Sequence, residues 1–118
     1  MNIALENILK KCLDKNNNTR SEGEKEINTL ANQDFGLLLE SCSEFLADES
    51  KQVQLRQLSA TLIKNLVNNI VEHKGKWTRL PEEQKAKIKQ NTFQCLGSSS
   101  KDIRKASGLC VAGNQILT

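Results

Sequence analysis

Residues 55–63 read LRQLSATLI, and residues 103–111 read IRKASGLCV, which repeats the same order of apolar, basic and small residues 48 positions later. A fainter copy lies 36 positions before the first stretch, where Gly23, Ile27 and Leu30 precede Ser59, Ile63 and Leu66. Self-similarity at a period of about 20–50 residues is typical of stacked arrays, in which each unit touches only its neighbours. The repeat therefore predicts an extended binding surface rather than an enclosed reaction site.

The composition favours helices packed through aliphatic side chains. The 118 residues suggest a single domain, and 37% of them are hydrophobic, but only 3% are aromatic and there is one Pro. Few aromatic residues and few helix breakers are typical of helical rather than sheet proteins. No apolar run approaches the roughly 20 residues that span a bilayer, so we expect no membrane partner.

The charge and the cysteines exclude several other classes of protein. A net charge of +3 is too small to indicate a dedicated nucleic-acid-binding protein. The four cysteines contain no C-x-x-C pair, and the one histidine, His73, is close to none of them in sequence. We therefore expect no metal site and no cofactor, and we interpret the cysteines as small core residues in a reducing compartment. No catalytic residues are predicted, because no histidine accompanies a Ser or Cys and no glycine-rich phosphate loop is present.

Apolar spacing and capping residues predict six helices, over about 3–14, 20–33, 35–47, 51–71, 81–97 and 101–117. Thr19 with Glu22 resembles a capping box, Asp34 is a predicted N-cap, Pro81 a predicted first helical residue and Gly97 a C-cap signal. Because the turns 14–18, 48–50 and 98–100 are short, consecutive helices form antiparallel pairs. The sequence thus predicts an all-α protein, an α-solenoid with repeats at about 1–33, 34–72 and 80–118. The apolar end of the chain favours a fragment of a longer array, with dimerisation through that end as the alternative.

One face of the fourth predicted helix is the best candidate for a binding surface. At 100° per residue, Gln54, Gln57, Thr61, Lys64, Asn65 and Asn68 fall on one stripe. The positions 36 residues earlier are also polar: Asn18, Ser21, Lys25, Asn28, Thr29 and Asn32. Amides both donate and accept hydrogen bonds, so the two stripes suit a protein partner on the inner side of the stack, although a solvated face is also polar. In the sixth helix Leu109 interrupts the stripe.

Two other residues are predicted to have structural roles. Arg56 lies within the apolar arc of the fourth helix, and Arg20 and Arg104 occupy the matching repeat positions. A buried arginine needs a partner, and we expect it to bond to the preceding turn, for instance at Asp48. Trp77 lies between the second and third pairs and is predicted to fill the gap between them, with a partner contact as the alternative.

Several motifs, in this order and spacing, resemble the importin-beta N-terminal domain of the karyopherin-beta family. They are residues 46–50 (LADES), Val53-x-x-Arg56-Gln57-Leu58-x-Ala60, residues 63–66 (IKNL), Trp77-x-x-Leu80, Gln84 to Lys89, and Leu96-Gly97. The early stretch Asn18 to Glu24 resembles the opening repeat of that domain, and residues 110–113 (CVAG) are closest to its importin-beta branch.

The resemblance implies a right-handed superhelical stack of HEAT repeats in a nuclear transport receptor that binds Ran-GTP through its second helices. It implies Ran contacts at Lys64 and Asn65, then at Gln57, Thr61 and Asn68, and more weakly at Lys25, Asn28 and Asn32. In a full-length receptor it also implies nucleoporins and cargo or an importin-alpha adaptor as partners, and a location in cytoplasm, nucleus and nuclear pore complex. The alternatives are a sister karyopherin, a HEAT-repeat scaffold of another kind, and a nucleic-acid-binding repeat that uses Lys74 to Lys89.

Overall fold

The computed structural model describes residues 4–69 and 73–112, and these residues are helical without any strand. The helices are α1 (Leu5–Cys12), α2 (Asn17–Gln33), α3 (Phe35–Ala47), α4 (Val53–Asn68), α5 (Glu82–Gln94) and α6 (Lys101–Ala112), with the short 3-10 helix η1 (Cys95–Gly97) after α5. Within the described ranges, no helix combines the length and the apolar character that a membrane crossing requires. The predicted all-α fold is confirmed.

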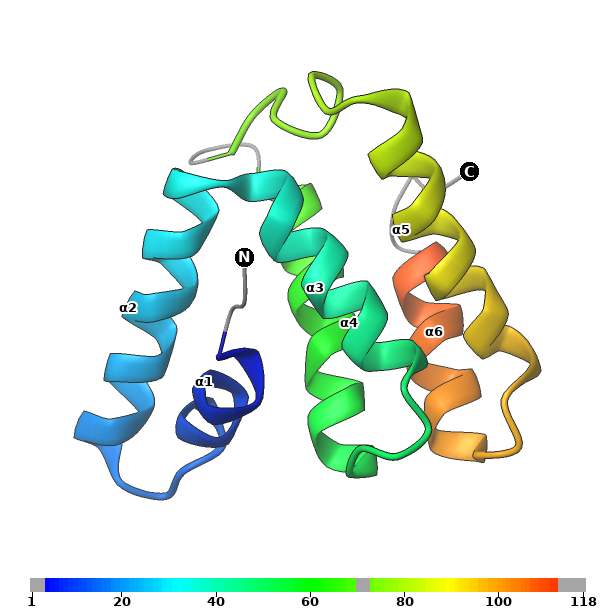
Figure 1. The fold of residues 1–118 in the computed structure, drawn as a ribbon. Coiled ribbons are helices and arrows are strands. Elements are labelled where there is room, and N and C mark those ends of the chain that lie inside the picture. Colours follow the sequence, from blue (N-terminus) through cyan, green and yellow to red (C-terminus); the bar gives the residue numbers. More distant parts are fainter. Residues whose placement is uncertain (1–3, 70–72, 113–118) are drawn as a thin grey trace.

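The helices pack as three successive pairs, α1 with α2, α3 with α4, and α5 with α6. The helices of the second and third pairs run antiparallel, whereas α1 is seen nearly end-on beside the upright α2 (Figure 1). In the second and third pairs, α3 lies beside α5 and α4 lies beside α6, so that first and second helices form separate layers. The first pair meets the second more obliquely, through contacts of α2 with α3 and of α1 with α4. This is the stacked, solenoid-like arrangement that the sequence repeat predicts.

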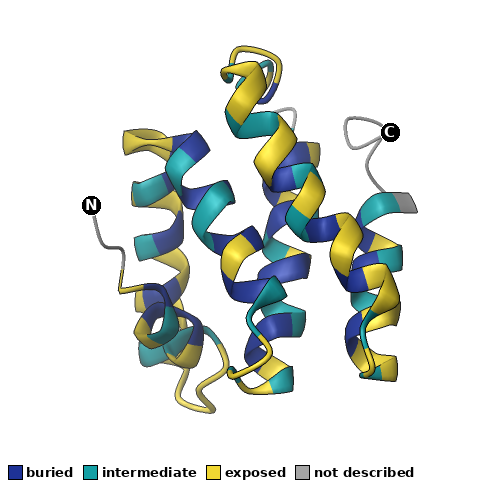
Figure 2. Cartoon of the chain, turned by 45° about the vertical axis from the view of Figure 1, so that its right-hand side comes forward, coloured by how far each residue is buried: buried dark blue, intermediate teal, exposed yellow. Residues whose placement is uncertain are grey.

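The core lies between the layers, where buried positions of the helices face one another (Figure 2). The repeat-equivalent residues Leu5, Leu38 and Ile88 are all buried. At a second set of equivalent positions, Leu46 is fully buried, whereas Leu13 and Leu96 are 50% and 43% exposed. Of the three pairs, only the central one has a neighbouring pair on both sides. Residues at equivalent positions of the repeat are therefore buried to different extents.

The helix ends are capped by side chains, although not always by the predicted ones. Asp34 caps α3 as expected, its Oδ1 accepting from the Leu37 amide at 3.0 Å. The predicted Thr19 cap is wrong, because α2 begins at Asn17 and the Asn16 side chain accepts from the amides of Asn18 and Thr19. Asparagine is at least as good an N-cap as threonine, and Asn16 comes first along the chain. Pro81 precedes α5 as its N-cap residue instead of being its first helical residue.

An arginine recurs at the equivalent position of each second helix and bonds to a backbone carbonyl that precedes this helix. Arg56 is 4% exposed, and its Nε donates to the Leu46 carbonyl at 2.8 Å. Arg104 and Arg20 are exposed and reach carbonyls of their own turns, at Ser98 (2.8 Å) and Asp14 (3.5 Å). The partner of Arg56 is thus a carbonyl and not the Asp48 carboxylate, which accepts from Ser50 and whose pKa is lowered mainly by those hydrogen bonds.

A small residue recurs where each second helix crosses its first helix. Gly23, Ser59 and Ser107 are buried at equivalent positions. A Cβ at Gly23 would lie 2.9 Å from the backbone nitrogen and the Sγ of Cys12. The close approach of α1 and α2 therefore requires glycine at this position.

We expect Arg56→Ala to lower the free energy of unfolding by about 2 kcal/mol, because it removes a buried, charge-assisted hydrogen bond. Arg104→Ala is the matched control, since its hydrogen bonds are exposed, and it should cost about 0.5 kcal/mol or less. Urea unfolding followed by circular dichroism measures both. Equal losses for the two variants would contradict the structural role of Arg56.

Gly23→Ala should destabilise the chain by about 1–2 kcal/mol, because α1 must move to accept the new methyl group. Gly108→Ala in α6 should instead stabilise it by about 0.5–1 kcal/mol, since alanine has the higher helix propensity. The nearest atom to a Cβ at Gly108, on Leu96, is 4.0 Å away. Thermal unfolding of the two variants measures both changes in stability. Melting temperatures that shift in the same direction would contradict the expected opposite effects.

Candidate protein-binding face

The predicted binding residues lie on the layer of second helices, on a surface that we call the second-helix face, formed by the solvent side of α2, α4 and α6. On α2, Lys25, Asn28 and Asn32 are exposed. On α4, Thr61, Asn65 and Asn68 are exposed, while Gln57 and Lys64 are half-buried. Every residue predicted to contact a partner thus retains some solvent access. Five of them line two grooves, whereas Lys25, Asn32 and Asn68 lie outside both.

The first groove, the α2–α4 groove, has a volume of about 270 Å³. Its apolar lining comes from Ile27, Leu62 and Leu66, and its polar rim includes Asn28 and Asn65. The fold thus brings two of the predicted amides, 37 residues apart in the sequence, to the same hollow. Cys12 of α1 also lines the groove, and the pKa of its thiol is raised, mainly by burial.

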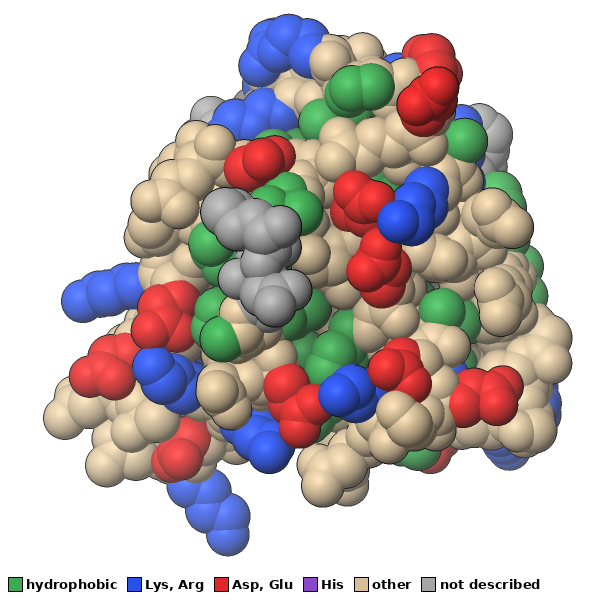
Figure 3. Space-filling model, viewed as in Figure 1, with side chains coloured by type: hydrophobic (Ala, Val, Ile, Leu, Met, Phe, Trp, Pro, Cys, Tyr) green, Lys and Arg blue, Asp and Glu red, His purple; other side chains and the backbone are tan. Residues whose placement is uncertain are grey.

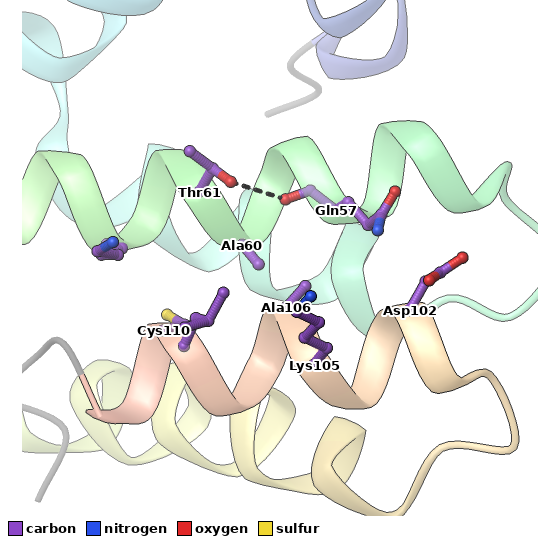
Figure 4. A pocket seen from close by; sticks show the side chains of 9 residues that line it. Gln57, Ala60, Thr61, Asp102, Lys105, Ala106 and Cys110 are labelled. Atoms are coloured by element: carbon purple, nitrogen blue, oxygen red, sulfur yellow. Dashed lines mark hydrogen bonds between the residues drawn. The ribbon is translucent and has the colours of Figure 1, made fainter.

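The second groove, the α4–α6 groove, also has a volume of about 270 Å³ (Figure 4). Ala60 and Ala106 point toward each other between the two helices, with Gln57 and Thr61 on the α4 side. The Thr61 hydroxyl donates to the Gln57 carbonyl at 3.2 Å, so this hydroxyl is engaged within α4. Lys64, Asp102, Lys105, Leu109 and Cys110 complete the lining. The sequence did not predict that α6 contributes to this groove, because the equivalent face of α6 is not rich in amides.

Asn32 is held by the linker that follows α4. Lys76 Nζ donates to Asn32 Oδ1 at 3.1 Å and to the Ala31 carbonyl at 3.4 Å, and it lies 5.7 Å from the centre of the Phe35 ring. The same linker carries Trp77, which is 5% exposed and belongs to the core. Asn32 is therefore less available to a partner than Asn28 or Asn65.

The two layers differ in how their charges are used. On the layer of first helices, Lys87 Nζ lies 2.8 Å from carboxylates of both Glu40 and Glu44, which raise its pKa well above the usual value. Lys51 pairs with Glu6 in the same way at 2.9 Å. Side chains of both signs alternate over this side of the molecule (Figure 3). Among the residues that the structure describes, Lys25, Lys64 and Lys105 on the second-helix face form no ion pair.

The basic stretch Lys74 to Lys89 is partly neutralised in this arrangement. Lys87 is paired with two glutamates, Lys85 with Glu82 at 3.0 Å, and Lys76 is engaged with Asn32. Neutralised lysines contribute little attraction to nucleic acid. This geometry disfavours the nucleic-acid alternative that the sequence left open.

Comparison with known proteins assigns the family. The profile of the importin-beta N-terminal domain matches residues 23–98. The chain belongs to this family. Two solved structures have the same helical solenoid as this importin-beta-type chain, each at 25% sequence identity and each covering 92% of it. One, with a TM-score of 0.80, is Kap95p in a complex where its binding induces the switch loops of RanGDP to adopt the GTP-bound conformation.

The other solved structure, with a TM-score of 0.79, is a Kap95:Nup1 complex. The chain spans 14% of the length of each of these two chains. A search of curated proteins gave no match. The similarity therefore confirms the predicted family and the predicted solenoid, for a stretch that corresponds to a small part of the larger receptors.

Because Cys12 lines the α2–α4 groove, the structure predicts the order in which the cysteine thiols react. At pH 8, N-ethylmaleimide should modify Cys12 first, because Cys12 is half-buried at an open groove whereas Cys42, Cys95 and Cys110 are buried. Cys42 should react last, since burial raises the pKa of its thiol to about 12 and the thiolate is the reactive form. Mass spectrometry of timed samples measures the order, and Cys12→Ser should remove the fast phase. Equal rates at all four thiols would contradict the open groove.

Proposed function

We propose that the chain is part of a nuclear transport receptor and that its second-helix face binds Ran in the GTP-bound form. The observation that carries this proposal is the similarity, over 92% of the chain, to a Kap95p chain solved with Ran. In that complex Kap95p binding imposes the GTP-bound conformation on the switch loops of RanGDP. A surface that stabilises one conformation of its ligand binds that conformation more tightly.

The chemistry of the second-helix face supports a protein partner. Asn28 and Asn65 stand at the two sides of the α2–α4 groove, above an apolar strip that includes Leu62. Exposed amides can pair with the backbone of a partner, while the apolar strip accepts a side chain. Lys25 on α2 and Lys64 in the α4–α6 groove have no carboxylate partner among the described residues. Gln57, Thr61 and Asn68 extend the proposed contact along α4, and Asn32 contributes less because Lys76 holds it.

The remaining parts of the proposal concern a longer protein. The repeats at about 1–33, 34–72 and 80–118 would be the first units of a longer array, as the 14% coverage of the Kap95 chains suggests. Nucleoporins, by analogy with the Kap95:Nup1 complex, and cargo or an importin-alpha adaptor would be its other partners, in cytoplasm, nucleus and nuclear pore complex. Ran-GTP would favour one curvature of the array and cargo another, so that binding of the first releases the second. This role requires no catalytic step and no cofactor.

The test is a titration of the 118-residue chain with Ran loaded with a non-hydrolysable GTP analogue or with GDP, measured by isothermal calorimetry. We expect binding to the GTP form that is at least tenfold tighter than to the GDP form. Lys64→Ala combined with Asn65→Ala should weaken that binding about tenfold, a typical loss for central contact residues.

The matched control is Lys89→Ala combined with Gln90→Ala, an adjacent lysine and amide on α5 in the layer of first helices. This pair should leave the affinity within about twofold, because it lies away from the proposed contact. Equal affinity for the two nucleotide forms, or an equal loss in the two double variants, would refute the proposed site.

A further inference from the structure

The α4–α6 groove differs in chemistry from the α2–α4 groove. The α2–α4 groove is rimmed by amides, whereas the α4–α6 groove carries two lysines, Lys64 and Lys105, and one large apolar residue, Leu109. The hollow exists because Ala60 and Ala106 face each other where α4 and α6 pack (Figure 4). Two small residues leave a space of about 270 Å³ that larger ones would fill.

Leu109 is 56% exposed, the highest value among the exposed large hydrophobic residues of the described chain. It occupies the position 48 residues after Thr61, so an apolar side chain replaces a polar one at the same place in the repeat. A single exposed leucine needs no explanation by itself. Leu109 differs from Leu13 or Leu96 because it lines a groove together with two cations.

The cations in this groove lack internal partners. Neither Lys64 nor Lys105 forms an ion pair within the part of the chain that the structure describes. Among the described residues, Asp102 is the one carboxylate that lines the groove; it lies in the first turn of α6, where it interacts favourably with the helix dipole. Other lysines of the molecule are neutralised, as Lys87 is by Glu40 and Glu44. The groove thus presents a net positive, partly apolar surface.

We propose that the α4–α6 groove binds a short acidic segment of a partner protein, whose aliphatic side chain packs on Leu109 and whose carboxylates meet Lys64 and Lys105. Charge complementarity favours an acidic segment, and Leu109 favours one with an aliphatic residue between its carboxylates. A nucleic acid fits less well, because none of the described residues that line the groove is aromatic and could stack with bases. The proposal stands independently of Ran, since it concerns only the chemistry of this groove.

Fluorescence anisotropy of the 118-residue chain with a fluorescein-labelled peptide of alternating Glu and Leu tests the proposal. We expect saturable binding that weakens as the salt concentration rises. Lys105→Gln should weaken it about threefold, which is typical of an exposed ion pair, and Leu109→Ser about fivefold through lost apolar contact. Both residues are exposed, so these variants should fold normally.

Matched controls separate the groove from general charge and apolar surface. Lys101→Gln on the same helix and Leu96→Ser, at another exposed leucine, should leave the affinity unchanged, because neither residue lines the groove. A peptide of alternating Lys and Leu should not bind. Absence of saturable binding, equal binding of the two peptides, tighter binding of a single-stranded oligonucleotide, or equal effects of Leu96→Ser and Leu109→Ser would each overturn the proposal.

The peptide probes contain no GTPase, and the variants leave α2 and α4 unchanged. Absence of peptide binding would therefore not alter the result expected from the Ran titration. Failure of the Ran titration likewise leaves this binding measurement intact. The two proposals are therefore tested separately, although both grooves share α4.

Discussion

One carbonyl oxygen joins two of the three helix pairs. The Leu46 carbonyl, at the end of α3, accepts from Arg56 Nε at 2.8 Å and from Cys95 Sγ at 3.6 Å. A buried guanidinium is tolerated only with such partners, so the turn between α3 and α4 must keep its shape. Because Cys95 belongs to the third pair, the same oxygen also sets how that pair rests on the second. The direction in which α4 presents Lys64 and Asn65, two turns further along, follows from this arrangement.

This constraint separates the two sides of the stack. On the side of the first helices several charges are paired internally, as Lys87 is with Glu40 and Glu44, and Lys51 with Glu6. The second-helix face instead keeps exposed amides at Asn28 and Asn65, around a groove with an apolar lining. A surface with satisfied ion pairs gains little from a new partner, whereas exposed amides beside apolar groups can gain contacts. The difference between the layers is the physical basis for proposing a binding site on the second helices.

The sequence predicted the helix pairs well, because apolar spacing and short turns are local features. It did not predict the Asn16 cap, since several polar residues there could cap α2 and only the path of the chain selects one. The unequal burial of Leu13, Leu46 and Leu96 depends on which pair lies in the middle of the stack. The amide stripe was visible in the sequence, but the two grooves were not, because a groove depends on helix spacing and on small residues such as Ala60 and Ala106. The engagement of Asn32 by Lys76 spans 44 residues and left no sequence signal.

We expect a partner protein to bind the layer of second helices. Hydrogen–deuterium exchange of the chain, with and without GTP-loaded Ran, tests it most directly, because exchange reports on each helix separately. Binding should slow exchange in α2 and α4, with α3 and α5 changed much less. Protection confined to α3 and α5, or spread equally over both layers, would contradict it.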